Sequence, residues 1–195
     1  MRDGVQAARS AEIAAASDVS PATLFNYFPT RPDLAAAWTR GELFGVLLEA
    51  CEGARDRGLR SALRRACREL AQRSLADAGA RLEAWRIVRR PVVVSGEPGF
   101  TAGRAALGSM VESEQGRDRI RGDIASTALA DLLVDALEGG MIEGLGSVEA
   151  ERAPDAVDPR LESFLRARVD LVLDGARKKN ERVRPLDARR TRAPS

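Results

Sequence analysis

The sequence predicts an all-α fold, and three observations lead to that prediction. Ala, Leu and Arg are abundant while aromatic residues make up only 4% of the chain, a mix that favours helices because straight-chain residues and Ala lose little rotamer freedom in them. Apolar residues recur three and four positions apart over long stretches, which is the period of one helix face. Apolar residues reach 44%, so we expect a folded core rather than disorder.

Helical segments separated by short breaks follow one another along the chain. The run PVVVSGEP at 91–98 is expected to be a connector, because its three valines are too few for a strand without a partner. Gly58, Pro29 and Gly175 mark helix ends. The predicted helices cover 10–16, 22–28, 31 to about 57, 59–78, 80–90, 100–116, 120–144 and 159–174.

The first two helices and their junction carry recognisable start signals. Ser20 is a good N-cap, and Pro21 suits the first helical position, where its missing N–H costs nothing. Asp18 lies in the tight turn between the helices and tolerates the left-handed conformation that such a turn needs. Thr30 followed by Asp33 resembles a capping box at the start of the long helix. Two short helices joined by a tight turn are the pattern of a helix-turn-helix.

A helix-turn-helix places its second helix in the DNA major groove. Asn26 can pair bidentately with adenine, and the methyl groups of Thr23 or Ala22 can contact the thymine methyl. Tyr27, Arg31 and the start of the second helix are placed to hold phosphates. An ordinary helix start on a surface helix remains the alternative at this point. The candidate DNA-binding residues are Arg9, Ser10, Ser20, Pro21, Ala22, Thr23, Asn26, Tyr27 and Arg31.

The segment 9–34 closely resembles the DNA-binding domain of TetR/AcrR-type transcriptional regulators. The resemblance is carried by Ile13-Ala14, Asp18-Val19-Ser20, Thr23-Leu24-Phe25, Tyr27-Phe28 and Thr30-Arg31. Asp18 replaces the usual turn glycine, and Phe25 replaces a tyrosine. The rest of the chain resembles the family only in layout.

The resemblance implies a TetR-like organisation of the whole chain. Residues 1–44 would form the helix-turn-helix DNA-binding domain, and 45–175 the helical ligand-binding and dimerisation domain. The helices near 128–144 and 159–174 would pair with a second copy, and the glycines of the former suggest close approach across that dimer. The middle helices would enclose a pocket for an unknown small-molecule effector, with Trp85, Phe100 and Met110 as candidates; plain core packing of these three side chains is the alternative.

The family's first helix has no counterpart in this sequence. Only three residues precede Gly4, so either the true start lies upstream or the helix has been lost. In the family that helix packs on Ile13, Leu24, Phe28 and Leu34, and each such side chain contributes about 1.5–3 kcal/mol when buried. We therefore expect a poorly held DNA-binding unit.

Charge is unevenly distributed. The segment 176–195 carries eight basic and two acidic residues, whereas the chain as a whole has a net charge of only +2. The remaining residues are therefore net acidic, and a DNA-binding role must depend on the local motif. The basic tail 176–195 is expected to be disordered.

The residue inventory argues against an enzyme. Histidine is absent, which removes the commonest general base and the usual zinc ligand sets. Cys51 and Cys67 lie in helical patterns and are expected to be buried small hydrophobes. No cofactor or metal is expected. The lack of a long apolar run or a signal peptide predicts a cytoplasmic protein without a membrane span.

The resemblance implies a ligand-responsive DNA-binding regulator, most often a repressor, that acts as a dimer on a palindromic DNA operator. The alternative is a helical sensing or interaction protein that no longer binds DNA specifically.

Overall fold

The computed structural model describes residues 10–75, 78–88, 98–150 and 159–178. Every regular element in these ranges is a helix, as the composition and periodicity predicted. The helices are α2 (Ser10–Ala16), α3 (Pro21–Tyr27), α4 (Arg31–Glu52), α5 (Leu59–Leu75), α6 (Ala78–Val88), α7 (Pro98–Gly116), α8 (Ser126–Ala150) and α9 (Pro159–Gly175).

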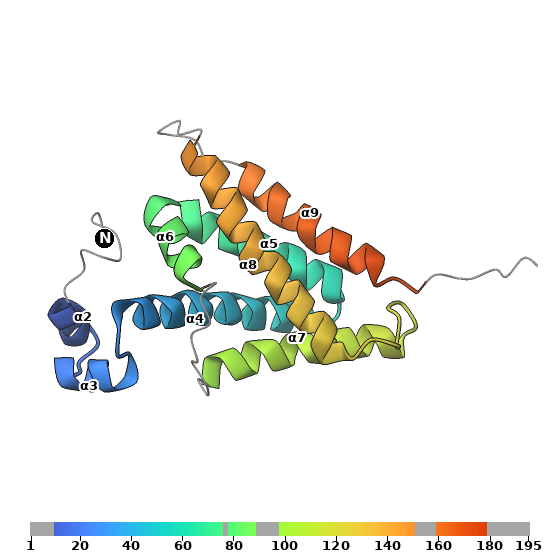
Figure 1. The fold of residues 1–195 in the computed structure, drawn as a ribbon. Coiled ribbons are helices and arrows are strands. Elements are labelled where there is room, and N and C mark those ends of the chain that lie inside the picture. Colours follow the sequence, from blue (N-terminus) through green and yellow to red (C-terminus); the bar gives the residue numbers. More distant parts are fainter. Residues whose placement is uncertain (1–9, 76–77, 89–97, 151–158, 179–195) are drawn as a thin grey trace, which may run out of the picture.

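The helices form a small N-terminal unit and a larger body that share one long helix. Figure 1 shows α2 and α3 packed together at the N-terminal end of α4, beyond the edge of the body. Helix α4 then runs into the body and packs against α5, α6 and α7. Helices α8 and α9 lie antiparallel across α5, α6 and α7. The N-terminal unit is thus connected to the body through α4.

One continuous apolar core holds the body together. Each helix from α4 to α9 contributes fully buried side chains to it, among them Leu47, Leu63, Leu107, Leu133 and Leu165, all with no exposed surface. Each buried Leu of this kind contributes about 1.5–3 kcal/mol relative to an exposed one.

The largest differences between the observed helix boundaries and the sequence prediction are in α4 and α8. The long helix ends at Glu52 rather than near 57, and Gly58 adopts a positive φ of 81° at the start of α5. Helix α8 begins at Ser126 rather than at 120, and it continues to Ala150 rather than ending at 144. The segment before α8 is held outside a helix by tertiary contacts. The Gln115 amide donates hydrogen bonds to the carbonyl oxygens of Arg121 and Ile124 at 2.9 and 2.8 Å.

Two of the glycines of α8 lie against α9 of the same chain. A Cβ at Gly140 would lie 2.8 Å from Leu165 Cδ2, and one at Gly144 would lie 2.5 Å from Leu161 Cδ1. These two glycines therefore allow α9 of the same chain to approach α8 closely. The expectation that they face a second copy across a dimer is wrong for both.

The first residues of the predicted tail pack on the body. Ala176 is buried, and its carbonyl oxygen accepts a hydrogen bond from the Arg121 N–H at 2.9 Å. Arg177 forms an isolated antiparallel bridge with Ile120, and Lys178 is ion-paired with Asp118. The remainder of the predicted tail, 179–195, lies outside the described residues.

Candidate nucleic-acid interface and effector cavity

The turn between α2 and α3 has the geometry expected of a helix-turn-helix. Asp18 adopts a φ of 54°, in the left-handed region that the turn requires. The Val19 N–H donates to the Ala14 carbonyl at 3.0 Å and closes the end of α2. Ala14 and Leu24 are buried between the two helices. The turn is therefore fixed by backbone hydrogen bonds and by a small apolar contact.

Local side-chain caps fix the start of α3 and the start of α4. The Ser20 Oγ accepts a hydrogen bond from the Thr23 N–H at 3.0 Å, and the two hydroxyl oxygens lie 2.8 Å apart. Thr30 and Asp33 form the predicted capping box, in which Asp33 Oδ2 accepts from the Thr30 N–H at 3.0 Å and Thr30 Oγ1 from the Asp33 N–H at 3.3 Å. Each such cap contributes about 0.5–2 kcal/mol. The orientation of α3 at the end of α4 is thus set locally.

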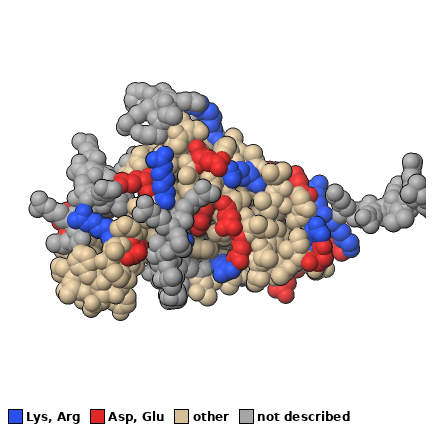
Figure 2. Space-filling model, viewed as in Figure 1, with Lys and Arg blue, Asp and Glu red and all other residues tan. Residues whose placement is uncertain are grey.

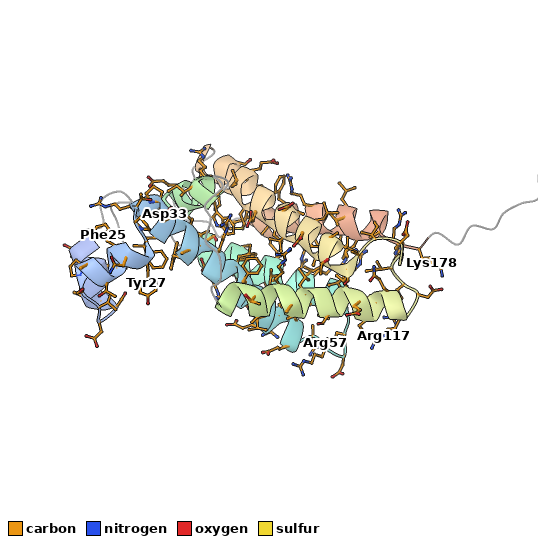
Figure 3. All side chains as sticks on the ribbon, turned by 60° about the horizontal axis from the view of Figure 1, so that its bottom comes forward. Phe25, Tyr27, Asp33, Arg57, Arg117 and Lys178 are labelled. Atoms are coloured by element: carbon orange, nitrogen blue, oxygen red, sulfur yellow. The ribbon has the colours of Figure 1, made fainter. Side chains whose placement is uncertain are left out.

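Most of the predicted DNA-binding side chains lie on the open surface of this unit. Thr23 is half-buried, because its hydroxyl lies against Ser20 in the cap. Tyr27 is 77% exposed, and Figure 3 shows it with Phe25 at the end of the molecule that α2 and α3 form. Arg9 and the side chain of Ser10 lie outside the described residues. The exposed predicted residues are Ser20, Pro21, Ala22, Asn26, Tyr27 and Arg31.

The surface of this unit carries little charge. The segment 10–31 contains two acidic residues, Glu12 and Asp18, and one basic residue, Arg31. Figure 2 shows the end formed by α2 and α3 as almost entirely uncharged on the visible face. General attraction to phosphates is therefore weak here, and the groups offered to a partner are uncharged hydrogen-bonding side chains and methyl groups.

A cavity of about 880 Å³ opens between α4, α7 and α8. Helix α4 contributes Arg40 and Phe44 to its wall. Ala130 and Val134 form an apolar floor with Phe44, and all three are buried. This volume lies within the range of small-molecule sites, about 300–1,000 Å³. The cavity therefore places potential ligand contacts on the same helix that carries α2 and α3.

The predicted ligand-binding residues do not gather in this cavity. Trp85 is buried in the core with 1% exposure, lines none of the cavities described, and its indole N–H has no hydrogen-bond partner among the described residues. Met110 lines a second, smaller cavity of about 350 Å³ between α4 and α7. The side chain of Phe100 lies outside the described residues.

The residues that do line the larger cavity were missed by the sequence reasoning. Asp131, Asp135 and Glu138 follow one another at helical spacing on α8, in the middle of an apolar pattern. A polar stripe inside an otherwise apolar helix was the available signal, since such a stripe needs a polar or solvent-filled space beside it.

The outer surfaces of α8 and α9 expose large apolar side chains. Leu132 is 50% exposed, Phe164 37% and Leu171 76%. The Arg168 guanidinium lies 5.7 Å from the centre of the Phe164 ring. Protein–protein contact surfaces commonly use exposed apolar side chains of this size.

Both cysteines are buried, as predicted. Burial raises the pKa of the Cys51 thiol from 9.0 to about 11, and the nearby Glu52 carboxylate contributes to this rise. Burial also raises the pKa of Cys67, to about 12. Neither thiol is activated as a nucleophile.

Metal-binding clusters and membrane-spanning helices are both absent from the described part of the chain. No group of three or more acidic, cysteine or histidine side chains comes together as a metal site in these residues. None of the helices in the described ranges combines the length and the apolar character that crossing a bilayer requires.

Comparison with solved structures identifies a protein of the same architecture. The chain is similar to Thermus thermophilus FadR, described as a TetR-family transcriptional repressor and crystallised in complex with lauroyl-CoA, with a TM-score of 0.63. The match covers 97% of this chain and 90% of the other at 21% sequence identity. No protein-family model and no curated protein matches the sequence. At this identity the comparison confirms the fold, and the predicted all-α, TetR-like architecture is correct.

Proposed function

We propose that this chain is a cytoplasmic, effector-responsive transcriptional regulator that binds DNA as a homodimer, most simply as a repressor. The observation that carries the proposal is the shared helix α4. Its N-terminal end holds the helix-turn-helix through the Thr30–Asp33 capping box, and its middle supplies Arg40 and Phe44 to the cavity. The similarity to the FadR repressor supports the same role.

DNA recognition in this proposal depends on α3. Its exposed Asn26 would pair with adenine, and Ala22 and Thr23 would offer methyl groups to thymine. Tyr27, Arg31 and the Ala22 N–H, the backbone donor at the start of α3 that neither Pro21 nor the Ser20 cap removes, would bind phosphates. A symmetric dimer formed through α8 and α9 would present two α3 helices, so we expect a palindromic operator with half-sites about 34 Å apart or a multiple of that distance.

Regulation in this proposal passes through α4. Arg81 of α6 is ion-paired with Glu42 and lies 4.3 Å from the centre of the Trp38 ring, which ties the first half of α4 to α6. Phe44 packs against Gly103 of α7, which ties the second half to the wall of the cavity. An effector that separates α7 from α4 would tilt α4 and change the spacing of the two α3 helices in the dimer.

The experiment is a selection of bound duplexes from a random DNA pool, followed by mobility shifts at two salt concentrations. We expect a palindromic site bound with a Kd of roughly 10⁻⁸ M or tighter. Asn26→Ala is expected to weaken that complex about tenfold or more, because a good bidentate contact is worth about 1–3 kcal/mol. Asp56→Asn, in the exposed α4–α5 loop, is the control and should leave the affinity unchanged.

A different outcome would favour the alternative of a sensing or interaction protein without specific DNA binding. In that case the pool yields no preferred sequence, any binding disappears as salt rises, and Asn26→Ala behaves like the parent protein. The low charge of segment 10–31 favours this alternative, because few basic side chains there can bind phosphates.

A further inference from the structure

The charge around the larger cavity is the basis for an inference about the class of effector, and this inference rests on the proposed regulatory function. Four carboxylates line the cavity but only two arginines do. Arg104 of α7 is ion-paired with Asp131 of α8, so one carboxylate is compensated within the wall. The lining residues that carry charge are Arg40, Arg104, Glu112, Asp131, Asp135 and Glu138.

Two of these carboxylates have no ion-pair partner in the part of the chain that the structure describes. Glu112 projects from α7 and Asp135 from α8, on either side of the opening, and both are exposed. Asp135 also lies four residues after Asp131 on the same helix face, but Arg104 already compensates the charge of Asp131. Glu112 and Asp135 would therefore be the main attraction for a positive charge in the cavity, and both would repel an anion.

The arrangement of the acids excludes a simple metal site within the described residues. No group of three or more of their acidic side chains comes close enough to hold a metal ion. The carboxylates are instead spread around an apolar floor made by Phe44, Ala130 and Val134. A diffuse negative rim above an apolar floor suits an organic cation with an apolar body, which can bury its hydrocarbon part and keep its charge at the rim.

We propose that the effector of this protein is an amphipathic organic cation bound between α4, α7 and α8. This preference is the opposite of the one expected for lauroyl-CoA, which is bound by the similar FadR protein and carries several phosphate charges. The fold is therefore shared with FadR, while the charge of this cavity selects a different ligand class.

The test compares probes that share one hydrocarbon chain and differ in the head group. Decyltrimethylammonium, decyl sulfate and decyl maltoside are titrated into the full chain by calorimetry below their micelle concentrations, with lauroyl-CoA as a fourth probe. We expect the cation to bind at least roughly tenfold more tightly than the neutral and anionic probes, a difference of about one decade in Kd. Added salt should reduce this preference, because exposed charges are screened.

Variants connect the preference to the cavity. Asp135→Asn and Glu112→Gln remove exposed charges without changing side-chain size, and together they should reduce the preference for the cation several-fold. Asp56→Asn removes an exposed carboxylate outside the cavity and should leave the preference intact. Equal binding of all head groups, tighter binding of decyl sulfate or lauroyl-CoA, absence of cation binding, or full preference in the double variant would each overturn the proposal.

The same titrations separate this inference from the proposed function. Addition of the cation to the selected DNA complex should release the DNA. Binding of the cation without any selected DNA site would refute the regulator and leave the ligand class standing. Release of DNA by lauroyl-CoA but not by the cation would refute the ligand class and leave the regulator standing.

Discussion

The contact between α4 and α7 offers the sharpest test of the packing. Gly103 of α7 lies against the backbone of Phe44, and a Cβ at this position would come within 2.3 Å of the Phe44 carbonyl oxygen and 2.9 Å of its carbonyl carbon. Contacts this short are not accommodated by moving a side chain, because the obstacle is backbone. Gly103→Ala must therefore push the two helices apart.

The loss of stability expected for Gly103→Ala is estimated by comparison with a second glycine on the same helix. A Cβ at Gly108 would have no atom of a neighbouring element within 4 Å, so Gly108→Ala meets open space. Both substitutions gain about 1 kcal/mol of helix propensity, and this gain cancels when the two variants are compared. What remains is the overpacking cost at Gly103, about 1–3 kcal/mol. For a chain of this size each kcal/mol shifts Tm by about 2–4 °C.

Thermal unfolding followed by circular dichroism at 222 nm measures the difference. We expect Gly108→Ala to melt at or slightly above the parent protein, and Gly103→Ala to melt roughly 2–12 °C below Gly108→Ala. Equal melting temperatures for the two variants, or a higher value for Gly103→Ala, would show that α4 and α7 are not packed as closely as described.

Three further predictions concern the thiols and the exposed surface of α8 and α9. At pH 8 the native thiols should react with a disulfide reagent at least roughly 100-fold more slowly than the thiols of the unfolded chain. The reason is that each unit by which the pKa rises lowers the thiolate fraction about tenfold. Fast reaction of the native protein would contradict the burial of Cys51 and Cys67. The pKa values of both thiols in the folded protein are raised above 9.0. The contribution of the protonated thiols to stability is therefore complete below about pH 9 and falls as the pH rises towards 11 and 12. Urea titrations at several pH values can follow this loss. Leu171→Glu should convert a dimer into a monomer in sedimentation experiments. Phe25→Glu places the same charge far from α8 and α9 and should not change the mass. A dimer that persists in Leu171→Glu would show that the interface lies elsewhere.

The features that the sequence predicted well are those fixed by neighbours in the chain. The Ser20 cap, the left-handed Asp18 and the Thr30–Asp33 capping box each depend on residues only a few positions away. Such interactions are visible in a sequence because the donor, the acceptor and the spacing are all local.

The features that were missed depend on contacts between distant segments. The start of α8 is set by Gln115 and by the return of the chain at Ala176, neither of which the periodicity of 120–144 reveals. The role of Gly140 depends on Leu165 of the neighbouring helix, and the burial of Trp85 depends on how α6 packs between α4 and α8. Helical period identifies an apolar face but not the surface that the face contacts.

The bridge between Ile120 and Arg177 has a consequence for how the last helix opens. Chain ends ordinarily fray first, because few contacts hold them. Here the end of α9 is fastened to the segment before α8 by the Arg121–Ala176 hydrogen bond and the Lys178–Asp118 ion pair. Unfolding of helix α9 from its C-terminal end must therefore break these contacts, and amide exchange along it should require opening of a larger cooperative unit that includes α8.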